Sequence, residues 1–116
     1  MEPQPRFIHG VFGFEGKGLT APSLLDPKAI YEVPRDKRAQ LIYLRAGNSS
    51  GELIYLTLMC DGKALRYFPI GAKSGMHVPL AVVEDLFPEA KLEVFFAAPV
   101  GVAGVLVVDI GIIEVD

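Results

Sequence analysis

The feature that most constrains the fold is an Asp-Gly dipeptide between two apolar runs, in the stretch from Glu52 to Pro69. Asp-Gly flanked by alternating apolar residues is the strongest short-range signal for a β-hairpin. Asp61 and Gly62 are therefore predicted to be the central residues of a type I′ turn. The register that keeps apolar residues opposite one another gives the facing pairs Cys60 with Lys63, Leu58 with Leu65, and Leu56 with Tyr67.

This register gives the hairpin apolar side chains on both faces. Leu56 and Leu58 share one face, and Tyr55 and Phe68 become a cross-strand pair on the other. One face can be buried in the interior of the fold. The other face then needs a second cover, which is either a partner protein or another segment of this chain.

The remaining apolar segments predict strands rather than helices. They are short and recur about every 8 to 12 residues, as in sandwiches, and no stretch longer than about ten residues keeps a 3.6-residue period. We predict an all-β, immunoglobulin-like antiparallel β-sandwich of about seven to eight strands. At most one short helical turn is expected, in residues 84–90. Residues 1–6 are expected to be flexible and residues 7–116 to form a single sandwich domain.

Two of these segments allow a more detailed prediction of where their residues lie. In Gln40 to Ala46 the alternation places Ile42 and Leu44 in the interior. Met76 to Val83 is interrupted by Pro79, which has no N–H to donate and therefore suits an edge strand.

The final apolar segment, Val105 to Val115, has two competing faces. Even-numbered apolar residues share one face up to Gly111, whereas beyond it Ile113 and Val115 also fit the interior, with Glu114 outside. A β-bulge at Gly111 would reconcile the two patterns.

Composition narrows the functional classes. The chain has 116 residues, 51% of them apolar, and a single cysteine, which excludes an internal disulfide framework. A reducing compartment fits this best, and we expect a cytoplasmic protein. The net charge of −3 argues against a nucleic-acid partner. No apolar run reaches the roughly 18 to 20 residues that span a bilayer, so no membrane span is expected.

The charge is divided unevenly along the chain. Residues 1–75 contain ten basic and seven acidic side chains, a net charge of +3, whereas residues 76–116 contain one basic and seven acidic side chains, a net charge of −6. Such a division allows complementary edges if the fold interleaves the two halves.

Residues 86–96 resemble the stretch before the penultimate strand of fibronectin type III and related bacterial immunoglobulin-like modules. Leu86 is followed by a proline two residues later and then by the alternating residues Leu92, Val94 and Phe96. Leu92 occupies the position where the family usually has a tyrosine, so a tyrosine-corner hydrogen bond cannot form there. The resemblance implies a sandwich topology and an adhesion, assembly or docking role, and it implies no catalytic residue.

Mapped onto that topology, the hairpin, residues 91–98 and the final segment lie in one sheet. Their outward side chains are predicted to form an interface, consisting of Tyr55, Phe68, Phe95, Val105 and Val107. An apolar outer face rimmed by polar residues usually marks a contact surface. The alternative is that the N-terminal segment with Leu24 and Leu25 covers this face within the monomer.

Residues that could carry chemistry are few. The glycine-rich segment 10–18 lacks the spacing of a phosphate-binding loop, and a turn is the favoured interpretation. Cys60, His77 and Met76 are candidate metal ligands, but a copper site needs a second histidine beside them, and His9 has no motif relation to them. No catalytic or cofactor-binding residue is predicted.

The first hypothesis is therefore a non-enzymatic interaction or assembly module that docks to itself, as a homo-oligomer, or to a larger protein through the apolar sheet face. A subunit of a larger particle would be built in the same way. The alternative is a small-molecule or metal-binding protein with a pocket near His77 and Cys60.

Overall fold

The computed structural model describes residues 2–80 and 85–116. These residues form ten strands and contain no helix. The strands are β1 (Gln4–Glu15), β2 (Ser23–Leu24), β3 (Ile30–Glu32), β4 (Arg38–Asn48), β5 (Ile54–Cys60), β6 (Lys63–Ile70), β7 (Gly75–Pro79), β8 (Asp85–Leu86), β9 (Lys91–Ala97) and β10 (Ala103–Val115).

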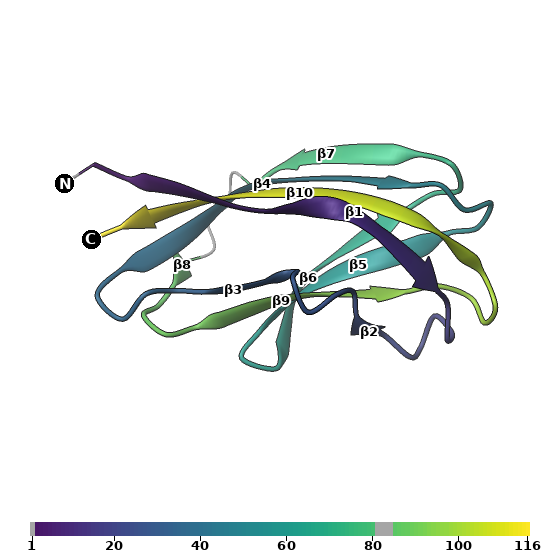
Figure 1. The fold of residues 1–116 in the computed structure, drawn as a ribbon, viewed down its shortest axis with the longest axis horizontal. Helices are drawn as coiled ribbons and strands as arrows, with labels where there is room; N and C mark the ends of the chain where they lie inside the picture. Colours follow the sequence, from purple (N-terminus) through teal and green to yellow (C-terminus); the bar gives the residue numbers. More distant parts are fainter. Residues whose placement is uncertain (1, 81–84) are drawn as a thin grey trace.

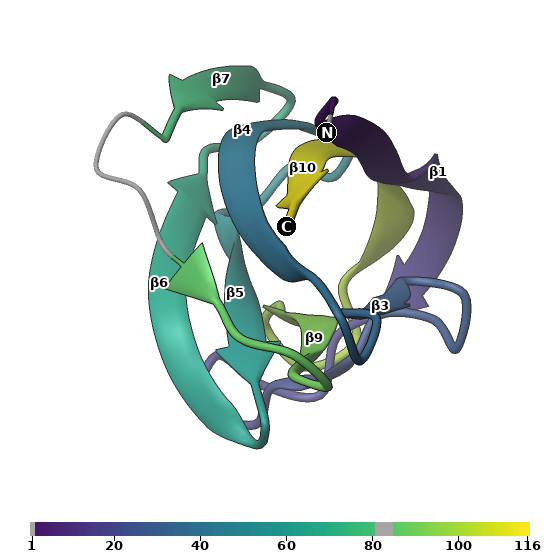
Figure 2. The ribbon, with the colours of Figure 1, turned by 90° about the vertical axis from the view of Figure 1, so that its left-hand side faces the viewer.

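The strands form two antiparallel sheets packed face to face (Figure 1). The first sheet has the order β1-β10-β4-β7, with β8 also paired to β4. The second has the order β2-β9-β5-β6, with β3 also paired to β9. In Figure 2 the first sheet runs across the top of the molecule from β7 to β1. The predicted class, an all-β antiparallel sandwich, is confirmed, with ten strands where seven to eight were expected.

The pairing is nested. β5 pairs with β6, β4 with β7 and β8, β2 and β3 with β9, and β1 with β10, so the chain resembles one long hairpin rolled into a sandwich. This strand order is that of a jelly roll. The expectation that the final strand lies in the same sheet as the hairpin is wrong, because β10 lies between β1 and β4 in the first sheet.

The nested pairing brings the basic and acidic parts of the sequence side by side. β1 to β5 of the basic first part each lie beside a strand that begins at residue 75 or later, whereas β6 is paired with β5. Ion pairs between described residues join the two parts, namely Arg6 with Glu114, Arg35 with Glu89 and Lys37 with Asp116.

The predicted hairpin turn is present, but its register is correct only near the turn. Asp61 and Gly62 have φ values of 50° and 83°, as a type I′ turn requires, and Cys60 pairs with Lys63. A β-bulge then adds Leu65 to β6, so Leu58 faces Arg66 rather than Leu65. Beyond the bulge Leu56 faces Phe68 rather than Tyr67.

The irregularity expected at Gly111 belongs to the partner strand. The register between β10 and β4 shifts at Gly111, but the extra residue is Ile42 in β4. Ile42 is therefore exposed, not interior as predicted, while Leu41 and Leu44 are fully buried. β10 keeps one parity to its end, and Glu114 points inward.

The core lies between the sheets. Leu44 and Ile110 of the first sheet and Leu56 and Leu92 of the second have no solvent exposure, and the rings of Phe14 and Phe96 meet edge to face with centroids 5.4 Å apart. β7 is an edge strand, as Pro79 predicted. Residues 81–83 of that predicted segment, and Glu84 of the predicted helical turn, lie outside the described residues. Residues 4–6, expected to be flexible, are part of β1.

Candidate functional site

The five predicted interface residues do not form one surface. Tyr55 and Phe95 lie on the outer face of the second sheet, whereas Val105 and Val107 lie on the outer face of the first. Phe68 is in the core with 5% of its surface exposed, because the bulge in β6 turns it inward. Placing all five in one sheet is therefore wrong, and their contact with a partner stays a prediction.

The outer face of the second sheet is partly covered from within the chain. The Tyr55 hydroxyl donates a 2.8 Å hydrogen bond to the carbonyl oxygen of Leu19, and β2 pairs Leu24 with Phe95. The exposed aromatic beside Tyr55 is Tyr67, whose ring centroid lies 5.8 Å away. The N-terminal segment thus borders this face as an edge strand, whereas the alternative to an interface had Leu24 and Leu25 covering it, and Leu25 enters the core.

The outward side of the first sheet is more open. From this point on, "outer face" means three cross-strand rows on that side. Read from β1 to β7, the rows are Val11–Val107–Gly47–Gly75, His9–Asp109–Arg45–His77 and Phe7–Gly111–Tyr43–Pro79. Phe7, Val11 and Val107 are 56%, 70% and 50% exposed. The outer face therefore places a row of polar side chains between two rows rich in apolar residues and glycine.

The middle row contains both histidines of the chain. His9 and His77 stand on the two edge strands, with Asp109 and Arg45 between them. Three strand spacings of about 4.8 Å separate the histidine backbones by roughly 14 Å. Among the described residues, neither histidine belongs to a group of three or more side chains that could hold a metal ion.

Tyr43 ties the polar row to the row below it. Its hydroxyl donates a 2.9 Å hydrogen bond to Oδ1 of Asp109, and the guanidinium carbon of Arg45 lies 4.9 Å from its ring centroid. Its ring also lies over Gly111, where a Cβ atom would come within 2.1 Å of it. Burial and the hydrogen bond to Asp109 raise the pKa of Tyr43. The glycine thus lets the ring lie flat on the sheet.

Glycines also hollow this surface. A hollow of about 390 Å3 is lined by Gly47, Gly75, Arg45, Val107 and neighbouring residues. A second, of about 430 Å3, lies beside Phe7, Val11 and Tyr43. Valine and aromatic side chains thus project from some positions of the outer face, and the surface is hollowed above Gly47 and Gly75.

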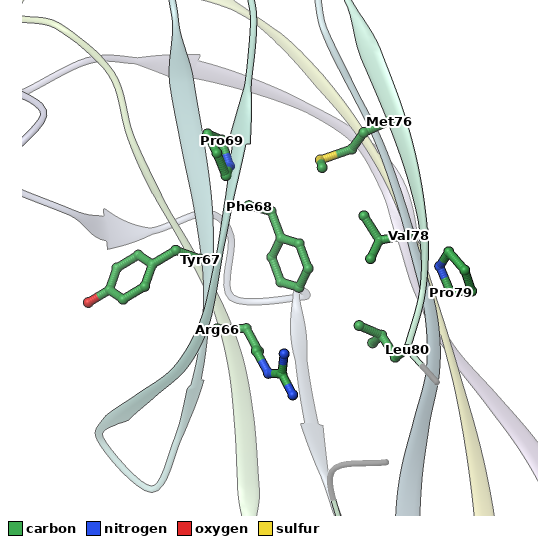
Figure 3. A pocket seen from close by; sticks show the side chains of 8 residues that line it. All are labelled: Arg66, Tyr67, Phe68, Pro69, Met76, Val78, Pro79 and Leu80. Carbon is green, nitrogen blue, oxygen red and sulfur yellow. The ribbon is translucent and has the colours of Figure 1, made fainter. Parts of the chain in front are cut away.

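A separate groove of about 390 Å3 lies between the edge strands β6 and β7. Figure 3 shows Phe68 pointing across this groove toward Met76, Val78 and Leu80, while Tyr67 points away from it. Mostly apolar side chains line the groove, together with Arg66, and Met76 is the one candidate metal ligand among them.

The candidate metal ligands Cys60, His77 and Met76 are not brought together. Cys60 lies in the second sheet, paired with Lys63 and Leu92, whereas Met76 and His77 are successive residues of β7 in the first sheet, on opposite faces. Burial, followed by the charge of Asp61, raises the pKa of the Cys60 thiol. Within residues 2–80 and 85–116, no three metal-ligating side chains are clustered.

A buried carboxylate links the two sheets at the end where the termini lie (Figure 1). Glu114 is 3% exposed. It accepts a 2.5 Å hydrogen bond from the Tyr31 hydroxyl of β3, and Nε of Arg6 in β1 lies 3.3 Å from the same carboxylate. Burial, then the hydrogen bond and charge of Glu114, raise the pKa of Tyr31.

This raised pKa predicts how stability depends on alkaline pH. The neutral phenol contributes fully below its ordinary pKa of about 10, and its contribution is lost as the pH rises through the raised pKa of the folded state. We expect Tyr31→Phe to lower the free energy of unfolding by about 1 to 2 kcal/mol at pH 7 and to flatten the decline in stability above about pH 10. Urea unfolding from pH 7 to 11 measures both, with Tyr67→Phe as the exposed control. Parallel pH profiles for Tyr31→Phe and the parent chain would contradict the prediction.

Sequence reasoning missed most of the outer face. Phe7, His9 and Val11 alternate with interior residues, which is a usable signal for one face of a strand. The sequence carried no signal that β4 and β7 complete this face, because their pairing depends on the overall topology.

Comparisons with known proteins identify no family. No family model and no curated protein matches the chain. Among solved structures, it is similar to a chain of the infectious bursal disease virus Gx strain, with 12% identity, 97% of this chain and 32% of that chain covered, and a TM-score of 0.47. It is also similar to the VP2 subviral particle of infectious bursal disease virus, with 10% identity, 97% and 36% covered, and a TM-score of 0.37.

The chain thus spans about a third of the length of these two viral chains. At these TM-scores the similarity supports no statement about function. These comparisons do not show the resemblance to immunoglobulin-like or fibronectin type III modules.

Proposed function

We propose that this chain is a non-enzymatic protein-interaction and assembly module that docks through the outer face of its first sheet. The observation that carries the proposal is the exposure of Phe7, Val11 and Val107 around a polar row. Large apolar side chains gathered in the open on one face of a fold mark a candidate contact site. Its location differs from the predicted interface, although Val105 and Val107 belong to this side of the sandwich.

The composition of the outer face suits a protein partner. Large apolar side chains supply area that is favourable to remove from water, at about 25 cal/mol per Å2 before the costs of association. Asp109, Arg45 and the two histidines supply the polar groups that fix orientation. A cytoplasmic location is part of this proposal and is supported by the single cysteine alone.

Site-specific photo-crosslinking tests the docking role in the cell that makes the protein. A photoreactive residue is placed at position 107 on the outer face, and in a separate chain at position 67 on the second sheet. We expect adducts from position 107 and none from position 67. Phe7→Lys should lower the yield at position 107 about tenfold, the effect of losing one apolar anchor. Equal yields from both positions, or none from position 107, would overturn the proposed function.

A further inference from the structure

We propose that the partner at this surface is a second copy of this chain, stacked face to face about a two-fold axis that runs along the strands between β10 and β4. The inference rests on the proposed docking role of the outer face. Such an axis brings β10 onto β4 of the other copy and β1 onto β7. Each contact then occurs twice, as in any isologous dimer.

The polar row is complementary to itself under this rotation. Its order is His9, Asp109, Arg45, His77, so Asp109 of each copy faces Arg45 of the other. Two opposite-charge pairs therefore form at the centre of the interface, while the histidines face one another at its edges. A row with any like-charged residues at its two middle positions would repel its own copy.

The row of Val11, Val107, Gly47 and Gly75 is complementary to itself in shape. Val11 and Val107 stand opposite Gly75 and Gly47 of the other copy. The two valines thus meet strands at positions where no side chain projects. The hollow of about 390 Å3 above Gly47 and Gly75 is the space that the two valines would enter.

The area of the outer face sets the expected affinity of the dimer. Four strands about 4.8 Å apart, and three outward residues along each at about 6.7 Å spacing, present roughly 400 Å2 per copy. About 800 Å2 in total is below the size of standard specific interfaces and fits a weak, transient association. Because sheets that pack face to face align to within about 30°, the strands of the two copies remain nearly parallel and the central pairs stay in register. We expect a weak dimer with micromolar affinity, not a permanent one.

A charge exchange between two separately made variants tests the geometry. Asp109→Arg sets like charges opposite each other twice in its own dimer, and so does Arg45→Asp. Each variant alone should self-associate about a hundredfold more weakly than the parent chain. An equal mixture of the two restores opposite charges at both central contacts and should form a heterodimer of near-parental affinity. Sedimentation equilibrium measures the affinities, and native mass spectrometry with one variant isotopically labelled identifies the heterodimer.

A second variant tests the shape without changing charge. A Cβ atom at Gly47 would meet its nearest neighbour, Cβ of Val107, at an ordinary 4.0 Å. Gly47→Val should therefore keep the fold, which a thermal melt checks, and fill the space the other copy needs. We expect at least a tenfold loss of self-association. The matched control, Tyr67→Lys on the second sheet, should leave self-association unchanged.

The outcomes separate this inference from the proposed function. A parent chain that stays monomeric up to about 1 mM, far above the expected micromolar dissociation constant, overturns the second copy as partner. So does a mixture of the two charge variants that forms no heterodimer. If crosslinking from position 107 then captures a different protein, the docking role stands and the self-association falls. If position 107 gives adducts to this same chain, both stand.

Discussion

Replacing Gly16 by alanine is expected to lower the free energy of unfolding by about 3 kcal/mol or more. Gly16 follows β1 and is clamped between two backbone hydrogen bonds. Its N–H donates to the carbonyl of Val102 at 2.7 Å, and its carbonyl accepts from the N–H of Gly101 at 3.0 Å. A Cβ atom at Gly16 would lie 2.1 Å from the carbonyl oxygen of Pro99. Because the obstacle is backbone rather than a flexible side chain, the two turns would have to separate.

Chemical denaturation compares Gly16→Ala with Gly13→Ala, where no atom lies within 4 Å of the added Cβ. The control should unfold at or slightly above the denaturant concentration of the parent chain, since alanine costs less conformational entropy than glycine. Equal stabilities for the two variants would show that the turns adjust without strain. Within the glycine-rich segment 10–18, Gly16 is thus explained by the close approach of two backbone segments.

Replacing Glu114 by alanine is expected to cost about 3 kcal/mol. The substitution removes the acceptor of the Tyr31 hydroxyl and the counter-charge of Arg6 together, and leaves a space in the interior. An unpaired buried hydroxyl costs about 1 to 3 kcal/mol by itself. The partly exposed Arg6 can turn toward water, which keeps the loss below that of a fully buried ion pair.

Thermal and urea unfolding of Glu114→Ala measure the loss, with Glu93→Ala as the control. Glu93 is a half-buried carboxylate on β9 whose pairing with Lys91 spans 3.9 Å, so its removal should cost about 0.5 kcal/mol or less. Tyr31→Phe combined with Glu114→Ala should cost less than the two single changes added together, because both remove the same hydrogen bond. Full additivity would mean that Tyr31 and Glu114 do not act as a unit.

Local chemistry predicted local structure well. Asp61 and Gly62 form the expected turn because positive φ is required at both positions, and both residue types tolerate it. Pro79 correctly marked an edge strand. The all-β class followed from short apolar segments that lack the 3.6-residue period of a helix.

Register was predicted less well, since it depends on single extra residues. Leu65 and Ile42 are each the additional residue of a bulge, and neither is a glycine or a polar residue that would mark one. Each bulge reverses the faces of the residues beyond it. Phe68 therefore moved from the expected surface to the core, and Ile42 from the expected core to the surface.

The site was the least predictable part. Val105 and Val107 were correctly placed on an outward face, but the neighbours of β10 depend on pairing between residues about a hundred positions apart. The immunoglobulin-like assignment put the wrong strands beside it. The polar row of His9, Asp109, Arg45 and His77 arises from four distant segments, and no local pattern in the sequence connects them.

The nested strand order also dictates when each part of the molecule can form during synthesis. The β5 and β6 pair closes through two residues, whereas the outermost pair joins Gln4 to Glu114. Closing a longer loop costs more entropy, so pairing is favoured from the inside outward. β9 and β10 each occupy an internal position in their sheets. A ribosome must therefore release nearly all of these residues before the strands of either sheet can pair fully. Until β10 has emerged, β1 has no strand to pair with.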